Sequence, residues 1–224
     1  MRVSLTLCLL AVCGVADAGR PFATEDAGVL ERAACEWENV AARATAPDTP
    51  RATGLSTQVG CGIGSDLQFA LNASRAKSDG ERASGLGLAG KWGLWADGES
   101  SLTLAWGSSW SKLRGAGTDW DGAAALLAFS QGLGGGWTAH ANLGRSYSRA
   151  DRSSVTIWAG LVERQLSDSF DVGAEFFGEG SQRPGFGVGA RWRPAPGWTL
   201  DASLARSGST PRERLFTLGF KLEF

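Results

Sequence analysis

The chain has little of what enzyme active sites and nucleic-acid-binding proteins use. Its 224 residues include one histidine, one methionine and one tyrosine, and 22 basic residues are balanced by 23 acidic ones to a net charge of −1. A balanced charge offers no general attraction to nucleic acid, so no nucleic-acid partner is predicted. With a single histidine and no His/Cys cluster, neither a metal site nor another cofactor is predicted. The 32 glycines and ten tryptophans that are present are unusual for a soluble enzyme.

Long hydrophobic runs are also missing after the first 18 residues. The most apolar later run, 122–129, is far below the ~18 residues of a membrane-spanning helix. Residues 1–18 combine Arg2, an apolar stretch and Ala16-Asp17-Ala18, the pattern of a cleaved signal peptide. A retained anchor and lipid attachment at Cys13 are the alternatives. We expect export, a mature start near Gly19 and a periplasmic segment over residues 19–32.

Only two of the four cysteines remain once a signal peptide is removed. Cys35 and Cys61 would then lie in a compartment that permits disulfides. In two antiparallel strands around a loop centred near Asp48, these cysteines face each other, because each is thirteen residues from Asp48. Opposed Cβ atoms at ~4.5–5.5 Å approach disulfide range. A Cys35–Cys61 disulfide is therefore predicted.

The end of the chain alternates strictly between apolar and polar residues. One face of residues 214–224 carries only large apolar side chains: Phe216, Leu218, Phe220, Leu222 and Phe224. A period of two indicates a β-strand. A strand of this kind that ends in an aromatic residue resembles the closing strand of bacterial outer-membrane proteins, whose terminal Phe is read by the barrel-assembly machinery. We therefore predict Phe224 as an assembly signal and that machinery as a partner.

Twelve segments of this kind can be cut from residues 33–224. They lie near 33–42, 54–63, 66–75, 86–96, 100–110, 122–131, 136–147, 154–165, 169–177, 185–193, 197–206 and 213–224. All seven prolines fall outside these segments or at their limits, as the missing N–H requires in a closed sheet. Short connections without Lys or Arg alternate with longer, charged ones. This predicts an all-β fold, a closed antiparallel transmembrane β-barrel of about 12 strands with short periplasmic turns and longer outer loops.

The aromatic residues favour a membrane barrel over a soluble one. In this arrangement they sort to the two ends of the strands, as membrane girdles do: Trp92, Trp95, Trp137, Phe170, Trp192 and Trp198 at the periplasmic end, and Trp110, Trp120, Tyr147 and Phe177 at the outer end. We therefore expect the bacterial outer membrane as the location and its lipid as a partner.

Basic residues collect at the outer ends: Arg43, Arg51, Arg75, Lys77, Arg82, Lys112, Arg114, Arg149, Arg152, Arg183, Arg206, Arg212 and Arg214. A basic fringe would suit the phosphates of lipopolysaccharide; an ordinary solvated surface is the alternative.

The face opposite the apolar one is polar in most strands. The residues predicted to line the lumen or a constriction within it are Glu36, Glu38, Lys91, His140, Asn142, Glu175, Arg191, Arg193, Asp201, Lys221 and Glu223. Segments 122–131 and 154–165 alternate poorly, and their inner faces stay unassigned. Charges of both signs form either a filter for solutes or a ladder that only compensates buried charge.

The start of the mature chain resembles a known family. Residues 20–27 read RPFATEDA, and an acidic first strand with Glu36 and Glu38 and a Gly-rich second strand follow. This pattern resembles the proteobacterial outer-membrane family labelled as transporters, or as the MetA-pathway of phenol degradation. The resemblance covers roughly residues 20–64. It implies passage of small or hydrophobic compounds, and it implies no catalytic residue.

Three function classes follow, in this order. The first is a channel or transporter for small solutes, hydrophobic ones among them. The second is a closed structural or surface-binding barrel, whose lumen is plugged by side chains or by the N-terminal segment. The third is an outer-membrane lipid hydrolase, which we do not expect, because the only histidine, His140, has Asn142 where such enzymes carry a serine and Ser146 lies too far along the strand.

Overall fold

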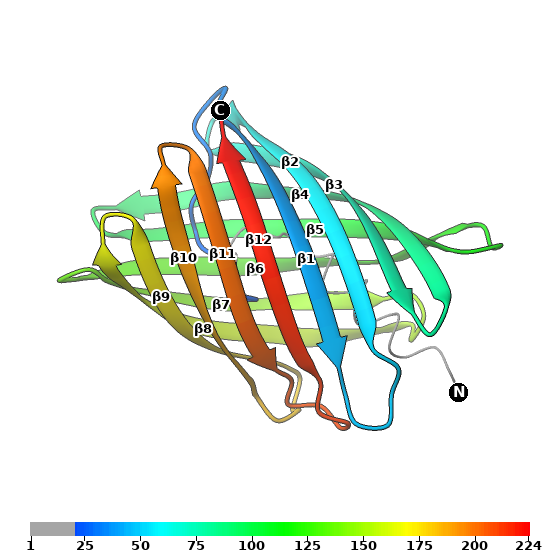
Figure 1. Ribbon diagram of the computed structural model, residues 1–224. Helices are drawn as coiled ribbons and strands as arrows, with labels where there is room; N and C mark the ends of the chain where they lie inside the picture. The colour runs from blue at the N-terminus through cyan, green and yellow to red at the C-terminus, as the bar shows by residue number, and fades with distance from the viewer. Residues whose placement is uncertain (1–20) are drawn as a thin grey trace.

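The structure is a computed structural model that describes residues 21–224. Every strand pairs antiparallel with its neighbours in sequence, and β1 pairs with β12, so the sheet closes into a barrel (Figure 1). This confirms the predicted fold class. In the described range no helix is long and apolar enough to cross a membrane. The strands are β1 (Cys35–Thr45), β2 (Ala52–Gly64), β3 (Leu67–Ser78), β4 (Glu81–Asp97), β5 (Ser100–Leu113), β6 (Thr118–Gly134), β7 (Trp137–Ser148), β8 (Ser153–Ser167), β9 (Phe170–Glu179), β10 (Gly185–Ala195), β11 (Trp198–Arg206) and β12 (Arg214–Glu223).

The two ends of the barrel differ in their connections. One end, here called the turn end, carries the C-terminus and five connections of two residues each (Figure 1): 65–66, 98–99, 135–136, 168–169 and 196–197. Glycines such as Gly98 and Gly197 adopt positive φ in these turns, as hairpins this tight require. The opposite end, the loop end, carries 46–51, 79–80, 114–117, 149–152, 180–184 and 207–213.

The strands are longer at the loop end than predicted. The loop expected over residues 76–85 is reduced to a turn at Asp79 and Gly80, because Lys77 pairs with Arg82 and Ser78 with Glu81. The loop expected over 111–121 shrinks in the same way, and Figure 1 shows the β5–β6 hairpin reaching beyond its neighbours. Beyond the apolar band the outward side chains become polar, so hydrophobic alternation ends before backbone pairing does.

The outer surface of the barrel is apolar. Large hydrophobic side chains are more than half exposed on it, among them Leu55 (64%), Leu71 (67%) and Leu143 (62%). The residues between them in each strand face inward and are mostly small or polar. A water-soluble barrel would bury its apolar face, whereas a barrel in lipid exposes it. Trp92 and Trp192 at the turn end are each about half exposed on the same surface (49%), as a girdle requires.

The first hairpin carries the disulfide. Cys35 and Cys61 are opposed partners in the β1–β2 register, and their sulfur atoms are bonded. This confirms the predicted pairing. Cys8 and Cys13, with the rest of the predicted signal peptide, lie outside the described residues.

Thiol titration checks the disulfide in the isolated protein. Denatured, unreduced mature protein should show no free thiol, and the same sample after reduction should show two. A Cys35→Ser/Cys61→Ser variant is the matched control and should show none in either state. Two titratable thiols in the unreduced mature protein would contradict the bond.

Candidate functional site: the barrel lumen

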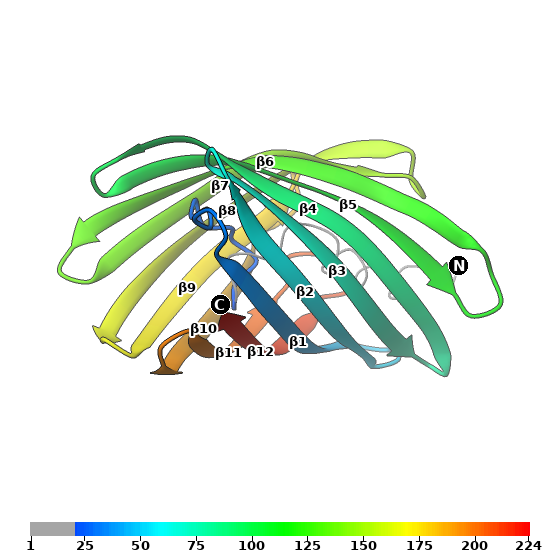
Figure 2. The same ribbon diagram turned by 90° about the horizontal axis from the view of Figure 1, so that it is seen from above.

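Part of the chain lies inside the barrel. Residues 21–34, here called the luminal segment, turn back from the start of β1 and run along the inner wall (Figure 2). Thr24 is fully buried, and Phe22, Glu25 and Ala27 are each less than 9% exposed. The RPFATEDA motif, as far as it is described, therefore meets the lumen wall rather than solvent. The sequence placed this stretch in the periplasm and offered it only as one possible plug of a closed barrel, with no contacts assigned.

Two strand residues hold the backbone of this segment. The carboxylate of Glu175 (β9) accepts hydrogen bonds from the N–H of Ala23 (3.1 Å) and from the N–H and hydroxyl of Thr24 (3.0 and 2.9 Å). Asn142 (β7) bonds Glu25 reciprocally: its Oδ1 accepts from the N–H at 2.6 Å, and its Nδ2 donates to the carbonyl at 2.8 Å. Polar backbone groups placed in a low-dielectric lumen are costly unless they are satisfied in this way.

Lys91 (β4) holds the acidic part of the motif. Its Nζ lies 2.5 Å from Glu25 Oε1 and 3.2 Å from Asp26 Oδ1, and it donates to the carbonyls of Asp26 and Gly28. The side chains of Lys91 and Glu25 are 4% and 3% exposed. Burial raises the pKa of the Asp26 carboxyl, but the Lys91 ammonium and the Gly28 N–H together outweigh it and keep that pKa below its ordinary value.

The next residues of the segment rest on β5 and β6. Thr103 donates to the carbonyl of Ala27 at 2.7 Å, and Ser130 Oγ accepts from the N–H of the same residue at 2.9 Å. The methyl group of Ala27 packs in a small apolar cluster with Ala105, Leu126 and Ala128. This resolves the inner face of β6, which is formed by Leu126, Ala128 and Ser130.

A second group of charges lies across β8, β9 and β10. Arg193 makes a two-pronged ion pair with Asp171, with nitrogen–oxygen distances of 2.5 and 2.7 Å. Arg191 Nη1 lies 3.4 Å from Glu163 and 3.9 Å from Asp171. Such forked pairs are geometrically specific and stronger than neutral hydrogen bonds.

A third group of charged and polar side chains lies across β12, β1, β2 and β3, where the barrel closes. Lys221 Nζ is 2.7 Å from Glu223 and 3.6 Å from Glu36. Two glutamines continue the network, since Gln68 donates to Glu36 and Gln58 donates to Glu38. Asp201 (β11) is buried on the same inner wall.

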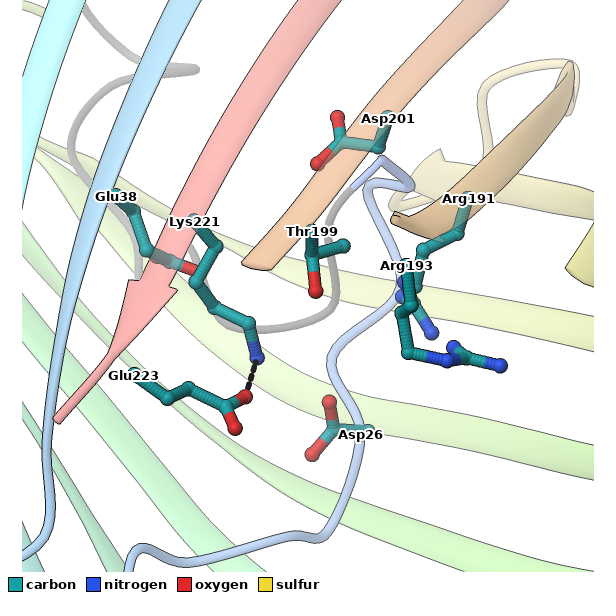
Figure 3. Close-up of a pocket in the computed structure, with 8 residues that line it drawn as sticks. All are labelled: Asp26, Glu38, Arg191, Arg193, Thr199, Asp201, Lys221 and Glu223. Atoms are coloured by element: carbon teal, nitrogen blue, oxygen red, sulfur yellow. Dashed lines mark ion pairs between the residues drawn. The ribbon is translucent and has the colours of Figure 1, made fainter. Parts of the chain in front are cut away.

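A cavity remains beside the luminal segment. Its volume is about 150 Å³, and Figure 3 shows Asp26 reaching it from the segment while the other lining residues come from the strands: Glu38, Arg191, Arg193, Thr199, Asp201, Lys221 and Glu223. Every lining residue is polar or charged, so water and small polar solutes are its natural contents.

His140 requires a correction. The sequence predicted no serine within reach of His140 on its own strand. The structure places one opposite it, across the β6–β7 pair. Ser130 Oγ lies 2.7 Å from His140 Nδ1, and His140 Nε2 lies 3.1 Å from Glu163. These three hydrogen-bonded side chains are of the residue types found in a catalytic triad. Ser130 Oγ also accepts a hydrogen bond from the N–H of Ala27, however, and Ser130 does not line the cavity described above, so the arrangement links the segment to the wall.

All eleven residues predicted to line the lumen lie on its inner wall, and the structure brings them into the groups above. That they form a constriction for solutes stays a prediction. Polar contributors that were not predicted from the sequence include Thr24, Glu25, Asp26, Thr103, Ser130, Glu163 and Thr199. An inward-facing Lys91 with no acidic residue opposite it was a signal that pointed to an acidic partner such as the TEDA motif. Among residues 21–224, no group of three or more His, Cys, Asp or Glu is placed to hold a metal ion.

Known proteins share the fold. The NanC porin has a TM-score of 0.64 at 8% identity, covering 83% of this chain and 98% of that one. The COG4313 outer membrane channel from Pseudomonas putida F1 has a TM-score of 0.63 at 12% identity, covering 89% and 98%. The KdgM porin in complex with disordered oligogalacturonate has a TM-score of 0.61 at 8% identity, covering 84% and 99%.

These likenesses show that the fold is that of bacterial outer-membrane barrels, in keeping with the lipid-facing exterior. No curated protein sequence matches the chain. A family model matches residues 6–224, nearly the whole length. The chain therefore belongs to the family described as Uncharacterised conserved protein UCP029691.

Proposed function

We propose that the protein is an outer-membrane channel that lets small solutes pass beside its luminal segment. The observation that carries this proposal is the cavity of about 150 Å³ between that segment and strands β10–β12 and β1, with its entirely polar lining. Side chains of both signs around a wet constriction are how pores select solutes. The barrels of similar fold include two porins and one outer membrane channel, which supports the same function.

The lining favours small polar or charged solutes over hydrophobic ones. The resemblance to the MetA-pathway family implied hydrophobic compounds, but Arg191, Arg193, Lys221 and Glu223 would have to lose part of their hydration to admit them. The passage of hydrophobic compounds thus remains a prediction from the resemblance.

Conductance of the purified, folded protein in planar lipid bilayers tests the channel. We expect small, discrete current steps in KCl. Liposome swelling with sugars and amino acids of increasing size then gives the size limit, and solutes much larger than the cavity should be excluded. A complete absence of steps from protein that shows heat-modifiable migration, and is therefore folded, would contradict the proposal.

The luminal segment gives specific support to a second function, a closed structural barrel. Its backbone is bonded by Glu175 and Asn142, and its acidic side chains are bonded by Lys91, so it is a well-held plug. A barrel closed by this segment would conduct only after the segment is removed, whereas the channel that we propose should conduct with the segment in place.

We propose no catalytic role for His140, because the hydroxyl of Ser130 is engaged with both the imidazole and the Ala27 N–H. Lipid hydrolysis by purified protein that disappears in a His140→Ala variant would overturn this.

The proposed route to the membrane begins with removal of residues 1–18 and ends with the assembly machinery reading Phe224. This residue is 67% exposed, and its backbone is paired with Cys35 at the turn end, which leaves the ring available. With the turn end in the periplasm, the basic loop end faces the leaflet that contains lipopolysaccharide, the lipid partner that we propose.

A further inference from the structure

The basic residues at the loop end are not spread evenly around the barrel. Five of them line one groove of about 810 Å³ across the outer ends of β3, β4 and β5: Arg75, Lys77, Arg82, Lys112 and Arg114. No acidic residue lines this groove. We call these five residues and the surface between them the basic groove.

Strand register fixes how closely these cations lie. Lys77 and Arg82 are directly opposed partners on β3 and β4, and Ser84, two residues beyond Arg82, lies between Arg75 and Lys112. Arg75, Lys77, Arg82 and Lys112 are exposed in strands whose alternate residues are buried inside the barrel, so they point outward. Like charges directly opposite each other destabilise a strand pair.

Within residues 21–224, no ion pair involves any of the five cations. Asp79 and Glu81 lie between Lys77 and Arg82 in the sequence, at the tip of the same hairpin, but neither lines the groove. The lining of the groove is therefore free of acidic residues, although the tip of its hairpin is not.

The surface next to the cations is apolar. Leu55 is the register partner of Arg75, and Leu86 follows Ser84 on the same outward face; they are 64% and 62% exposed. Ala41 and Leu55 also line the groove itself. Cations next to exposed leucines fit an amphiphile whose anionic group lies above its acyl chains. A freely soluble anion would make no use of an apolar contact with the leucines.

We propose that the basic groove binds the phosphate groups of one lipopolysaccharide molecule in the outer leaflet. Arg and Lys donate charge-assisted hydrogen bonds to phosphate oxygens, and the leucines contact the acyl chains. The proposal rests on the orientation given under the proposed function, with the loop end outward, and it does not depend on conduction.

Binding of lipid A to the folded, full-length mature protein in detergent tests the groove. An Arg75→Gln/Lys77→Gln/Arg82→Gln variant should bind bisphosphorylated lipid A about a hundredfold more weakly, since each cation near an anionic lipid surface contributes separately. The matched control, Arg149→Gln/Arg152→Gln/Arg183→Gln, removes three exposed loop-end cations outside the groove and should bind as the wild type does. Monophosphorylated lipid A should bind more weakly than the bisphosphorylated form.

Two outcomes overturn the proposal. One is equal affinity of the triple variant and the wild type for bisphosphorylated lipid A. The other is competition by inorganic phosphate at the same concentration as the lipid, which would make the groove a site for soluble anions. If the triple variant lacks heat-modifiable migration, the single Lys77→Gln variant replaces it, with an expected weakening of about fivefold; an unchanged affinity there also overturns the proposal. A wild-type protein that binds lipid A without conducting would contradict the channel alone.

Discussion

A Lys91→Met variant should show single-channel conductance several times that of the wild type. Methionine keeps the length of the side chain but removes the ammonium that contacts Glu25 and Asp26 and the carbonyls of Asp26 and Gly28. Taking one partner from a buried ion pair costs roughly 3–5 kcal/mol. A tenfold change in occupancy needs only about 1.4 kcal/mol, so the luminal segment should spend much of its time outside the lumen.

Single-channel recording in planar bilayers measures this effect, and Lys221→Met is the matched control. Lys221 is also an inward-facing lysine, but its ion pairs are with the strand residues Glu36 and Glu223, and it is 27% exposed. Its loss should leave the segment in place, so it should change ion selectivity, as the loss of a lining charge does, without raising the conductance several-fold. Equal conductance of Lys91→Met and wild type, with both proteins folded, would show that the lysine does not retain the segment.

An Arg191→Gln/Arg193→Gln variant should shift ion selectivity strongly toward cations. These two arginines line the cavity and pair with Glu163 and Asp171. Glutamine retains hydrogen-bond donors but removes two positive charges, which leaves the two carboxylates to dominate the local potential. A ring of acidic side chains favours cation passage. We also expect a loss of barrel stability, because the forked Arg193–Asp171 pair is 32% and 12% exposed and is only partly screened by water.

The reversal potential in a KCl gradient measures selectivity, and the temperature at which the folded band disappears in unboiled samples measures stability. Arg164→Gln is the matched control, since this arginine lies on the outer surface over the ring of Trp137. An unchanged reversal potential with reduced stability would make the charge ladder purely structural. If both quantities stay at their wild-type values, the ladder has neither role.

The register of the first hairpin shows what local sequence can predict. The pairing of Cys35 with Cys61 followed from their equal distance from Asp48, and the structure has that pairing. Strand existence was predictable for the same reason, because a period of two is visible within ten residues and proline is confined to strand limits and bulges; Pro194, the one proline inside a described strand, lies at the register shift near the end of β10. At the loop end the strands were predicted to be too short, because backbone pairing there continues after hydrophobic alternation has ended.

Contacts between residues far apart in the sequence could not be predicted from sequence patterns. Lys91 lies 65 residues from Asp26, and Ser130 reaches His140 only across a strand pair. The register within each hairpin and the closure of β1 onto β12 decide which inward side chains share a level of the lumen. Local periodicity was enough to predict the strands, their faces and the disulfide. The place of the luminal segment in the barrel and the charges that hold it depend on closure of the sheet, so the three-dimensional structure was needed to establish them.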